Sequence, residues 1–285
     1  MSKPYVVSAD ICLLLNEWAS QNRFILPGPD FIAELRSGFC VFMRNIFPVF
    51  EFVPEAELVG GITDLVAQSG LLPVSLDRVY FHSATHLDIT RLVDNAGNDR
   101  GLAHRPDTAS IIQQFRRLKE ISPKEIVLVD DVVFTGELLE RIIHCLSRVD
   151  IQVPLVCTGI GIAEGIRRIN QSKREVRCVR KFEEVIDEIC ERDFYPGVPL
   201  SGRLLVGDEN IGTPYLLPFG NPGKWASIPS RWQATFSKFC IQQTIQLFEE
   251  IERRSKKPVD CSGLGRCVVG LPRDGTRFVD ALRAL

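Results

Sequence analysis

In the middle of this chain, short apolar runs alternate with longer amphipathic stretches. The short runs have the length and the β-branched content of strands, and the longer stretches have the spacing of helices. The predicted strands are Arg78–Ser83, Ile126–Val132, Val153–Gly159 and Val176–Val179. The predicted helices are Thr108–Glu120, Glu137–Val149 and Ala163–Asn170. Strands and helices that alternate at these intervals predict an α/β fold with a parallel sheet and right-handed crossovers.

Both ends of the chain have patterns of their own. Residues 10–75 are mainly helical in pattern, with helices expected at Phe31–Met43 and Pro54–Gln68. Asp193–Gly223 is rich in Gly and Pro, and Arg231–Arg254 then has the spacing of a long amphipathic helix. We therefore expect three parts, which are a helical appendage (1–75), an α/β core (76–205) and a loop-rich and helical extension (206–285).

Composition narrows the class of protein. The chain has 285 residues, 45% of them hydrophobic and 25% charged, which are ordinary values for a globular protein. A net charge of −2 gives no reason to expect a surface for nucleic acid or an anionic membrane. No apolar run approaches the length of about 20 residues that spans a membrane. Nine cysteines without an export signal favour reduced thiols, and hence a cytoplasmic protein.

The run Glu125–Leu139 (EIVLVDDVVFTGELL) is the most informative in the chain. An apolar strand ends in two carboxylates, Asp130 and Asp131, and Thr135 and Gly136 come just before a helix. The start of a helix binds anions, and Gly136 lets the backbone approach a phosphate closely. Carboxylates at the carboxyl end of a strand can accept hydrogen bonds from vicinal hydroxyls or hold a hydrated Mg²⁺. A phosphate site beside a diol site is suited to a ribose 5-phosphate.

This run resembles the 5-phosphoribosyl-1-pyrophosphate (PRPP) loop of type I phosphoribosyltransferases. The resemblance implies that Asp130 and Asp131 bind the ribose hydroxyls and that Thr135 and Gly136 hold the 5′-phosphate. It also implies a type I phosphoribosyltransferase-like core with helical additions, a nucleobase acceptor, Mg²⁺ as cofactor near Asp130 and Asp131, and release of pyrophosphate. The implied PRPP-binding residues are Asp130, Asp131, Val132, Val133, Phe134, Thr135, Gly136, Glu137 and Leu138.

Two positions depart from the family pattern. Phe134 stands where the family usually has a small or polar residue, and it is a candidate for contact with the base. Leu138 stands where the family usually has Thr or Ser, so one hydroxyl for the phosphate is missing. Binding of a ribose phosphate tolerates these changes better than efficient catalysis does.

Thr85–Pro106 is long, polar and poor in apolar residues, as loops that cover active sites often are. By resemblance it occupies the place of the family's hood, and Arg91, Arg100 and Arg105 are candidates for binding pyrophosphate. His104 is a further candidate. For each of these side chains a solvated loop position is an equal alternative. Ser83-Ala84-Thr85 is either the family's pyrophosphate loop or an ordinary exit from a strand.

Asp193–Arg203 faintly resembles the stretch of hypoxanthine-type enzymes that stacks an aromatic ring on the base. By that analogy Phe194 or Tyr195 stacks on the base, and Arg203 contacts base or pyrophosphate. A Gly/Pro turn anchored by buried aromatic side chains is the alternative.

Two classes of function stay open from the sequence. The first is a PRPP-dependent glycosyltransferase, and the second is a non-catalytic relative that binds PRPP or a nucleotide and regulates a partner, as in stress or defence loci. A P-loop NTPase is disfavoured because no G-x-x-x-x-G-K-[ST] precedes the acidic strand. A response-regulator receiver is disfavoured because its acidic residues lie on an earlier strand of a shorter domain. A homodimer is possible on the analogy of the family.

Overall fold

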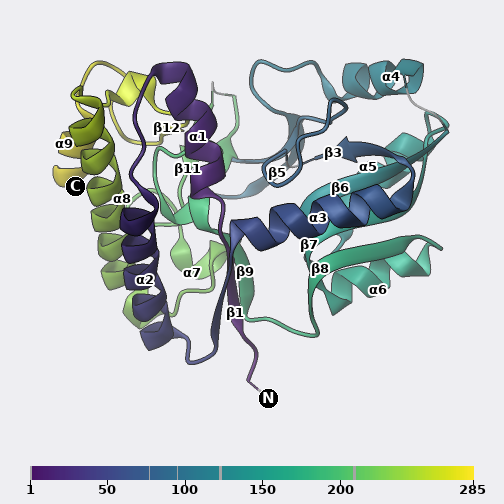
Figure 1. Cartoon of the computed structure of the whole chain (residues 1–285), viewed down its shortest axis with the longest axis horizontal. Helices are drawn as coiled ribbons and strands as arrows, with labels where there is room; N and C mark the ends of the chain where they lie inside the picture. Colours follow the sequence, from purple (N-terminus) through teal and green to yellow (C-terminus); the bar gives the residue numbers. More distant parts are fainter. Residues whose placement is uncertain (1, 77, 95, 122–123, 208–209) are drawn as a thin grey trace. The chain divides into compact units, whose positions relative to one another are not determined.

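The computed structural model describes residues 2–76, 78–94, 96–121, 124–207 and 210–285, and the chain forms two compact units. The α/β unit consists of Val53–Thr90 and Leu102–Val185. The terminal unit consists of Met1–Phe52, Arg91–Gly101 and Ile186–Leu285. Each unit is thus assembled from separated segments (Figure 1), whereas the sequence prediction divided the chain into three contiguous parts.

The α/β unit is built on a four-stranded parallel sheet, as the sequence predicts. The strand order is β3-β6-β7-β8, and each neighbouring pair is parallel. The strands are β3 (Leu72–Ser75), β6 (Glu125–Val133), β7 (Gln152–Ile162) and β8 (Glu175–Phe182). The central strand is buried along its whole apolar run, since Ile126–Val129 is at most 2% exposed.

The first strand of this sheet is not the one that the sequence predicts. The prediction of a strand at Arg78–Ser83 is wrong, and the strand is β3, which lies in the stretch predicted to be helical. Val79 and Tyr80 are adjacent and both buried, at 4% and 2% exposure, whereas an exposed-edge strand would turn one of them outward. The short run of β3 contains Pro73, which makes it look like the end of a loop.

Helices cover both faces of the sheet. A Cβ at Gly61 of α3 (Glu55–Ser69) would lie 2.5 Å from Val179, so α3 lies on one face of β8. A Cβ at Gly161 would lie 2.8 Å from Ile166 of α6 (Ala163–Gln171) and 2.9 Å from Cys178. Because adjacent strand residues point to opposite faces, Cys178 and Val179 place α6 on the face away from α3. In Figure 1, α3 can be followed along the strands β6 to β8.

A hydrophobic core joins the sheet to α4 (Ile111–Ile121) and α5 (Glu137–Ser147). Leu128 of β6 and Val156 of β7 meet Phe115 of α4 and Ile143 of α5 in this core. The six predicted helices all exist, with ends within three residues of the prediction. In this chain, a long helical periodicity therefore predicted helices reliably, whereas the pattern of a short run did not predict the first strand.

The terminal unit contains a second, smaller sheet of order β2-β1-β9. It consists of β1 (Tyr5–Ser8), β2 (Phe50–Val53) and β9 (Asp187–Cys190), with β1 and β9 parallel. Its longer helices are α1 (Ile11–Asn22), α2 (Pro29–Ile46) and α8 (Gln233–Ser255), and its shorter helices include α9 (Phe278–Arg283). Aromatic rings fill the interior, as where Phe194 packs edge-on against Phe236 with ring centroids 5.2 Å apart.

A buried carboxylate joins three elements of the terminal unit. Glu191 is 0% exposed, and its Oε2 accepts hydrogen bonds from the backbone N–H groups of Asp10 and Ile11 at the start of α1. Arg36 of α2 donates to both oxygens of Glu191, at 2.9 and 2.7 Å. Since a buried charge is tolerated only when it is paired and hydrogen-bonded, Glu191 ties α1 and α2 to the end of β9.

A third sheet has the order β12-β11-β10-β4-β5. Its strands are β4 (Ile89–Val93), β5 (Asp99–His104), β10 (Arg203–Leu205), β11 (Ile211–Thr213) and β12 (Cys267–Val268). The hairpin of β4 and β5 is the segment that the sequence assigns to the hood, and its part from Arg91 to Gly101 belongs to the terminal unit. Among the described residues, no helix is long and apolar enough to cross a membrane.

The tight contact between α3 and β8 gives a test of the fold. Gly61→Ala would place a methyl group against Val179, and overpacking of this kind typically costs about 1–3 kcal/mol. Gly60→Ala, one residue earlier in the same helix, meets nothing within 4 Å and should raise stability by about 0.5–1 kcal/mol. Urea unfolding of the two variants measures the difference. Equal stabilities would contradict the placement of α3 on β8.

Candidate functional site

The candidate site lies at the carboxyl end of β6 in the α/β unit. β6 is buried up to Val129, and Asp130 and Asp131 are then half-buried. Asp130 pairs with Thr158 of β7, so β7 fixes the backbone of the first carboxylate. The Asp131 Oδ1 accepts a hydrogen bond from the Val132 N–H at 2.8 Å. Both carboxylates therefore lie near the carboxyl-terminal ends of the strands, where parallel α/β sheets bind ligands.

The helix that follows presents its start beside this edge. Gly136 takes a left-handed conformation at φ 77° just before α5, and Thr135 accepts a hydrogen bond from the Glu137 N–H at 3.5 Å. The Glu140 N–H bonds to the Gly136 carbonyl at 2.9 Å. The Glu137 N–H is thus taken by Thr135, whereas the Leu138 and Leu139 amides have no acceptor within the helix, because only from Glu140 on does an N–H reach a carbonyl of this turn.

Two acidic side chains flank these amides. Glu137 and Glu140 lie in the first turn of α5, where negative charge would oppose an anionic ligand. Arg168 of α6 lies 3.5 Å from Glu137 and 3.8 Å from Glu140. The guanidinium of Arg168 therefore offsets part of that negative charge.

A close contact between two glycines sets the path of the loop from Phe134 to Gly136. A Cβ at Gly165 of α6 would lie 2.4 Å from the Phe134 carbonyl oxygen. A Cβ at Gly136 would lie 3.0 Å from the Gly165 carbonyl oxygen. The absence of both side chains lets the loop pack directly on the first turn of α6.

The loop after β3 contributes residues that the sequence prediction missed. Ser75 pairs with Val129, so this loop starts beside Asp130. The Ser75 Oγ accepts a hydrogen bond from the Arg78 N–H at 3.0 Å, and Arg78 has φ 64°, in the left-handed region. Arg78 is exposed and pairs with Asp88 at 2.9 Å. The missed signal was the short apolar strand that ends at Ser75.

Ser83-Ala84-Thr85 lies beside β3 rather than directly after a strand. The Ser83 Oγ donates to the Pro73 carbonyl at 2.9 Å, and the Ser75 N–H donates to the Thr85 carbonyl at 3.2 Å. The carboxyl end of β3 leads instead into Leu76 and Arg78. The pyrophosphate role considered for Ser83-Ala84-Thr85 thus rested on a strand that the fold does not contain.

The hood candidates fall in different units. Arg91 in β4 and Arg100 in β5 belong to the terminal unit, and both are exposed. Arg100 is paired with Asp94 at 2.7 Å. The backbone N–H of Asn98, with further donors that include Arg100, lowers the pKa of Asp94 to about 2. Arg105 belongs to the α/β unit, where it donates to the Leu76 carbonyl at 3.3 Å.

The prediction that Phe194 or Tyr195 stacks on a base is contradicted by their burial. Phe194 is 0% exposed and Tyr195 is 1% exposed, within the aromatic interior of the terminal unit. Their faces are occupied by neighbouring side chains, so they are the buried anchors of a Gly/Pro turn. Arg203 is half-buried in β10, with its guanidinium 4.9 Å from the ring centre of Trp225.

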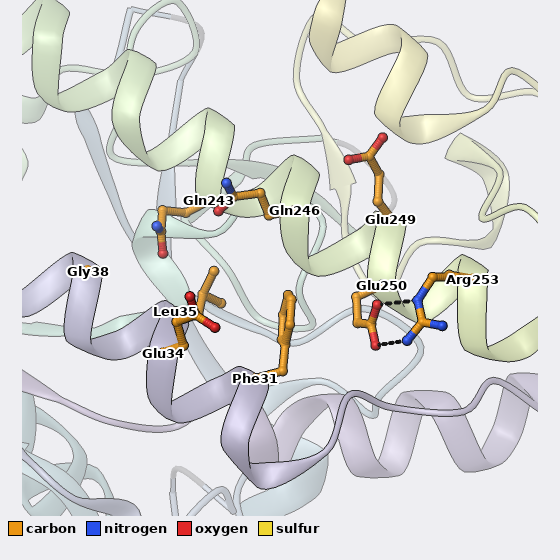
Figure 2. A pocket seen from close by; sticks show the side chains of 9 residues that line it. All are labelled: Phe31, Glu34, Leu35, Gly38, Gln243, Gln246, Glu249, Glu250 and Arg253. Carbon is orange, nitrogen blue, oxygen red and sulfur yellow. Dashed lines mark hydrogen bonds and ion pairs between the residues drawn. The ribbon is translucent and has the colours of Figure 1, made fainter.

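A pocket of about 510 Å³ lies elsewhere, between α2 and α8 of the terminal unit. Figure 2 shows Phe31 and Leu35 on one side of it and Gln243 and Gln246 on the other. Its rim carries carboxylates, one of which is Glu250, paired with Arg253 at 2.6 Å. This pocket contains none of the residues that the sequence predicts for the site.

The fit of the predicted Mg²⁺ ion to this site depends on the chemistry of two carboxylates. Within the described ranges, no group of three or more His, Cys, Asp or Glu side chains is arranged to hold a metal ion. Asp130 and Asp131 are adjacent hard oxygen donors. Because Mg²⁺ usually keeps several waters and is shared with substrate phosphates, a pair of carboxylates fits an ion that arrives with its phosphate ligand.

Comparison with known proteins gives matches to solved structures alone. No family model and no curated protein matches the chain. The solved structures include orotate phosphoribosyltransferase of Mycobacterium tuberculosis with inorganic phosphate, at 16% identity over 44% of this chain and 68% of that chain, with a TM-score of 0.27. They also include adenine phosphoribosyltransferase of Thermoanaerobacter pseudethanolicus, at 11% identity over 44% and 80% of the two chains, with a TM-score of 0.30. Both of these structures are phosphoribosyltransferases, and each covers less than half of this chain.

The contact between Gly165 and Phe134 can be tested directly. Gly165→Ala would bring a methyl group against a backbone oxygen, so the loop from Phe134 to Gly136 must move. We expect a loss of about 1–3 kcal/mol of stability, although alanine is the better helix former. Urea unfolding and hydrogen exchange of the peptide 130–140 measure the two effects. Gly60→Ala is the control, and faster exchange in both variants would contradict the specific role of Gly165.

Proposed function

We propose that the chain binds PRPP at Asp130–Leu138 and transfers its ribose 5-phosphate to a nucleobase or similar acceptor, with release of pyrophosphate. The observation that carries the proposal is the order of groups along one backbone. Two half-buried carboxylates lie near the end of a central parallel strand, and the left-handed Gly136 opens a helix five residues after Asp131.

The 5′-phosphate would be held mainly by backbone. The first amides of α5 point along the helix axis toward the end of β6, and the positive end of the helix dipole favours an anion there. Thr135 adds a hydroxyl group. Leu138 contributes only its N–H, because its side chain packs against the hydrophobic core.

The ribose would be held by carboxylates. Asp130 and Asp131 would accept hydrogen bonds from the 2′- and 3′-hydroxyls, and such charge-assisted bonds are stronger than neutral ones. Mg²⁺ bound to the pyrophosphate would neutralise part of its charge and improve it as a leaving group. Both roles need carboxylate oxygens at the carboxyl-terminal end of the sheet, and Asp130 and Asp131 supply them.

In the chemical step, a base nitrogen would form a bond to C1 of the ribose while the bond from C1 to the pyrophosphate oxygen breaks. The electron pair of the broken bond leaves with pyrophosphate, and the proton of the attacking base nitrogen would pass to solvent. Positive charge develops on the ring in the transition state, and the carboxylates of Asp130 and Asp131 would stabilise it electrostatically. Arg78, exposed after β3 in the same unit, is a suitable cation for the leaving pyrophosphate.

The roles of the hood and of the base site remain predictions. Arg91, Arg100 and Arg105 are proposed to meet pyrophosphate, and for Arg100 this requires exchange of its partner Asp94. Phe134, half-buried and three residues after Asp131, is proposed to contact the base. Arg203 is a further candidate for the base or pyrophosphate.

A second function is favoured by the packing of Leu138. A side chain committed to the hydrophobic core cannot supply the phosphate hydroxyl that related loops carry at this position. A protein that binds PRPP or a nucleotide without turning it over, and reports it to a partner, is compatible with this loop. Release of pyrophosphate across a panel of bases separates the two functions, because a non-catalytic binder releases none.

The carboxylates give the main test of the proposal. Asp130→Asn with Asp131→Asn keeps side-chain size and removes both charges, and each hydrogen bond to a charged group contributes about 1.5–3 kcal/mol. We therefore expect the affinity for PRPP with Mg²⁺ to fall at least about 100-fold, as measured by calorimetric titration. Asp150→Asn is the control, since Asp150 lies before the amino-terminal end of β7, away from the site, and its side chain is 83% exposed. Unchanged affinity in the double variant would refute the site.

Phe134 gives a test of the base site. Phe134→Ala removes the ring and keeps the backbone that packs on Gly165, so the phosphate loop should retain its shape. We expect the preference among bases to change more than the affinity for PRPP. Rates of pyrophosphate release for a panel of purines and pyrimidines, with PRPP titration alongside, measure both. An effect on PRPP affinity alone would place Phe134 outside the base site.

A further inference from the structure

We infer that Trp225 and β10 clamp the hairpin Arg91–Gly101, so that Trp225 is a positioning residue for the hood. The hairpin and its clamp both belong to the terminal unit. The name hood rests on the proposed function, whereas the clamp itself rests on contacts within this unit.

The first half of the clamp is backbone pairing along β4. Leu92 pairs with Leu204, and Val93 pairs with Leu205, in parallel register. The Val206 N–H then donates to the Val93 carbonyl at 2.9 Å. β10 is itself paired on its other edge with β11, so the hairpin is the continuation of a sheet rather than an isolated loop.

The second half of the clamp is at the tip of the hairpin. The Gly97 N–H donates to the Asp94 carbonyl at 2.8 Å, and Gly97 has φ 76°, in the left-handed region. A Cβ at Gly97 would lie 2.6 Å from the Trp225 Cζ2 and 3.4 Å from its Cη2. The tip of the hairpin thus rests directly on the edge of the indole ring.

Trp225 is fixed in place from several sides. It ends the short helix α7 (Pro222–Trp225) and is 5% exposed. The guanidinium of Arg203 lies 4.9 Å from its ring centre, and the ring of Tyr215 lies 5.5 Å away. A Cβ at Gly220 would lie 2.5 Å from its Cζ3. The indole ring therefore packs between the backbone at Gly97 and the backbone at Gly220.

The indole contributes its surface rather than its N–H. Its Nε1 is buried and has no hydrogen-bond partner among the described residues. An unpaired buried donor is unfavourable, so the N–H does not stabilise this position of the ring. The observed contacts of the ring are instead with Gly97, Gly220 and Arg203. An arrangement of this kind orders the hairpin before any ligand binds, which lowers the entropy lost when Arg91 and Arg100 engage one.

Hydrogen exchange of the peptide Arg91–Gly101 in the full chain tests the clamp. In Trp225→Ala, we expect exchange of this peptide to be at least about tenfold faster, while the peptide 126–133 of β6 is unchanged. Trp225→Phe keeps a ring and should restore most of the protection. Unchanged exchange in Trp225→Ala would overturn the clamp.

Two glycines of the same hairpin give a matched comparison that does not depend on Trp225→Ala folding normally. Gly97 and Gly101 both have positive φ, at 76° and 89°, so alanine strains the backbone at either position. Only at Gly97 does the new methyl group meet the indole, because a Cβ at Gly101 meets nothing within 4 Å. We expect Gly97→Ala to expose the hairpin more than Gly101→Ala. Trp225→Phe should relieve the effect of Gly97→Ala and leave that of Gly101→Ala unchanged, and equal effects at both glycines would contradict the clamp.

The same variants separate this inference from the proposed function. With the clamp loosened, we expect the Kd for PRPP to rise several-fold. We expect a smaller change in the affinity for inorganic phosphate, which under the proposed function only the start of α5 would bind. If the natural protein binds no PRPP, the proposed function fails while the exchange result still decides the clamp. If PRPP binds and faster exchange leaves its Kd unchanged, the hairpin is clamped but does not act as a hood.

Discussion

The parallel pairing of β6 with β3 and β7 is the constraint on which the α/β unit depends. It buries Ile126–Val129 between two neighbouring strands and two layers of helices, so the register of this strand has no freedom. Once the register is fixed, Asp130 and Asp131 must lie near the carboxyl-terminal end of β6, which continues to Val133 and leads through a three-residue turn into α5. The position of the candidate site is therefore a consequence of burying four apolar residues.

The turn that follows needs a second constraint, which is the lack of side chains at Gly136 and Gly165. The backbone of the loop lies against the first turn of α6, and either glycine with a methyl group would push the two apart. Gly136 also has a left-handed conformation that other residues adopt at a cost. The packing of this loop against α6 thus sets the direction of the first amides of α5. The two glycines that allow this packing are separated along the chain by α5 and β7.

Sequence reasoning found the parts of the fold that carry a long or strongly periodic signal. Six helices (α2, α3, α4, α5, α6 and α8) and the strands β6, β7 and β8 were predicted because each repeats its pattern over enough residues to stand out. β3 was missed because four residues with a proline carry almost no pattern, and Arg78 was missed as a consequence. The acidic pair and the Thr-Gly turn were visible because spacing along one segment defines them.

Contacts between distant segments were beyond the reach of the sequence. Phe194 and Tyr195 are equally consistent with a stacking surface and with an interior until Phe39, Phe236 and Gln243 are seen around them. The pairing of β4 with β10 joins residues more than one hundred positions apart, and nothing in either short strand identifies its partner. The division into two units, each made of separated segments, follows from such pairings and has no local signature.

Under the proposed function, Phe134 and Leu138 would matter less for ligand binding than for turnover, because binding and turnover depend on different atoms. Phosphate recognition at a helix start depends on backbone N–H groups, which are present whatever the side chain. Leu138 keeps its N–H and gains packing with the core, so it trades a hydroxyl donor for stability of the helix. Catalysis requires more, because a donor that strengthens only in the transition state cannot be replaced by one that binds the ground state equally well. A loop of this composition would therefore keep its proposed ligand through substitutions that slow or abolish the reaction. The release of pyrophosphate, rather than the affinity for PRPP, therefore distinguishes the two proposed functions.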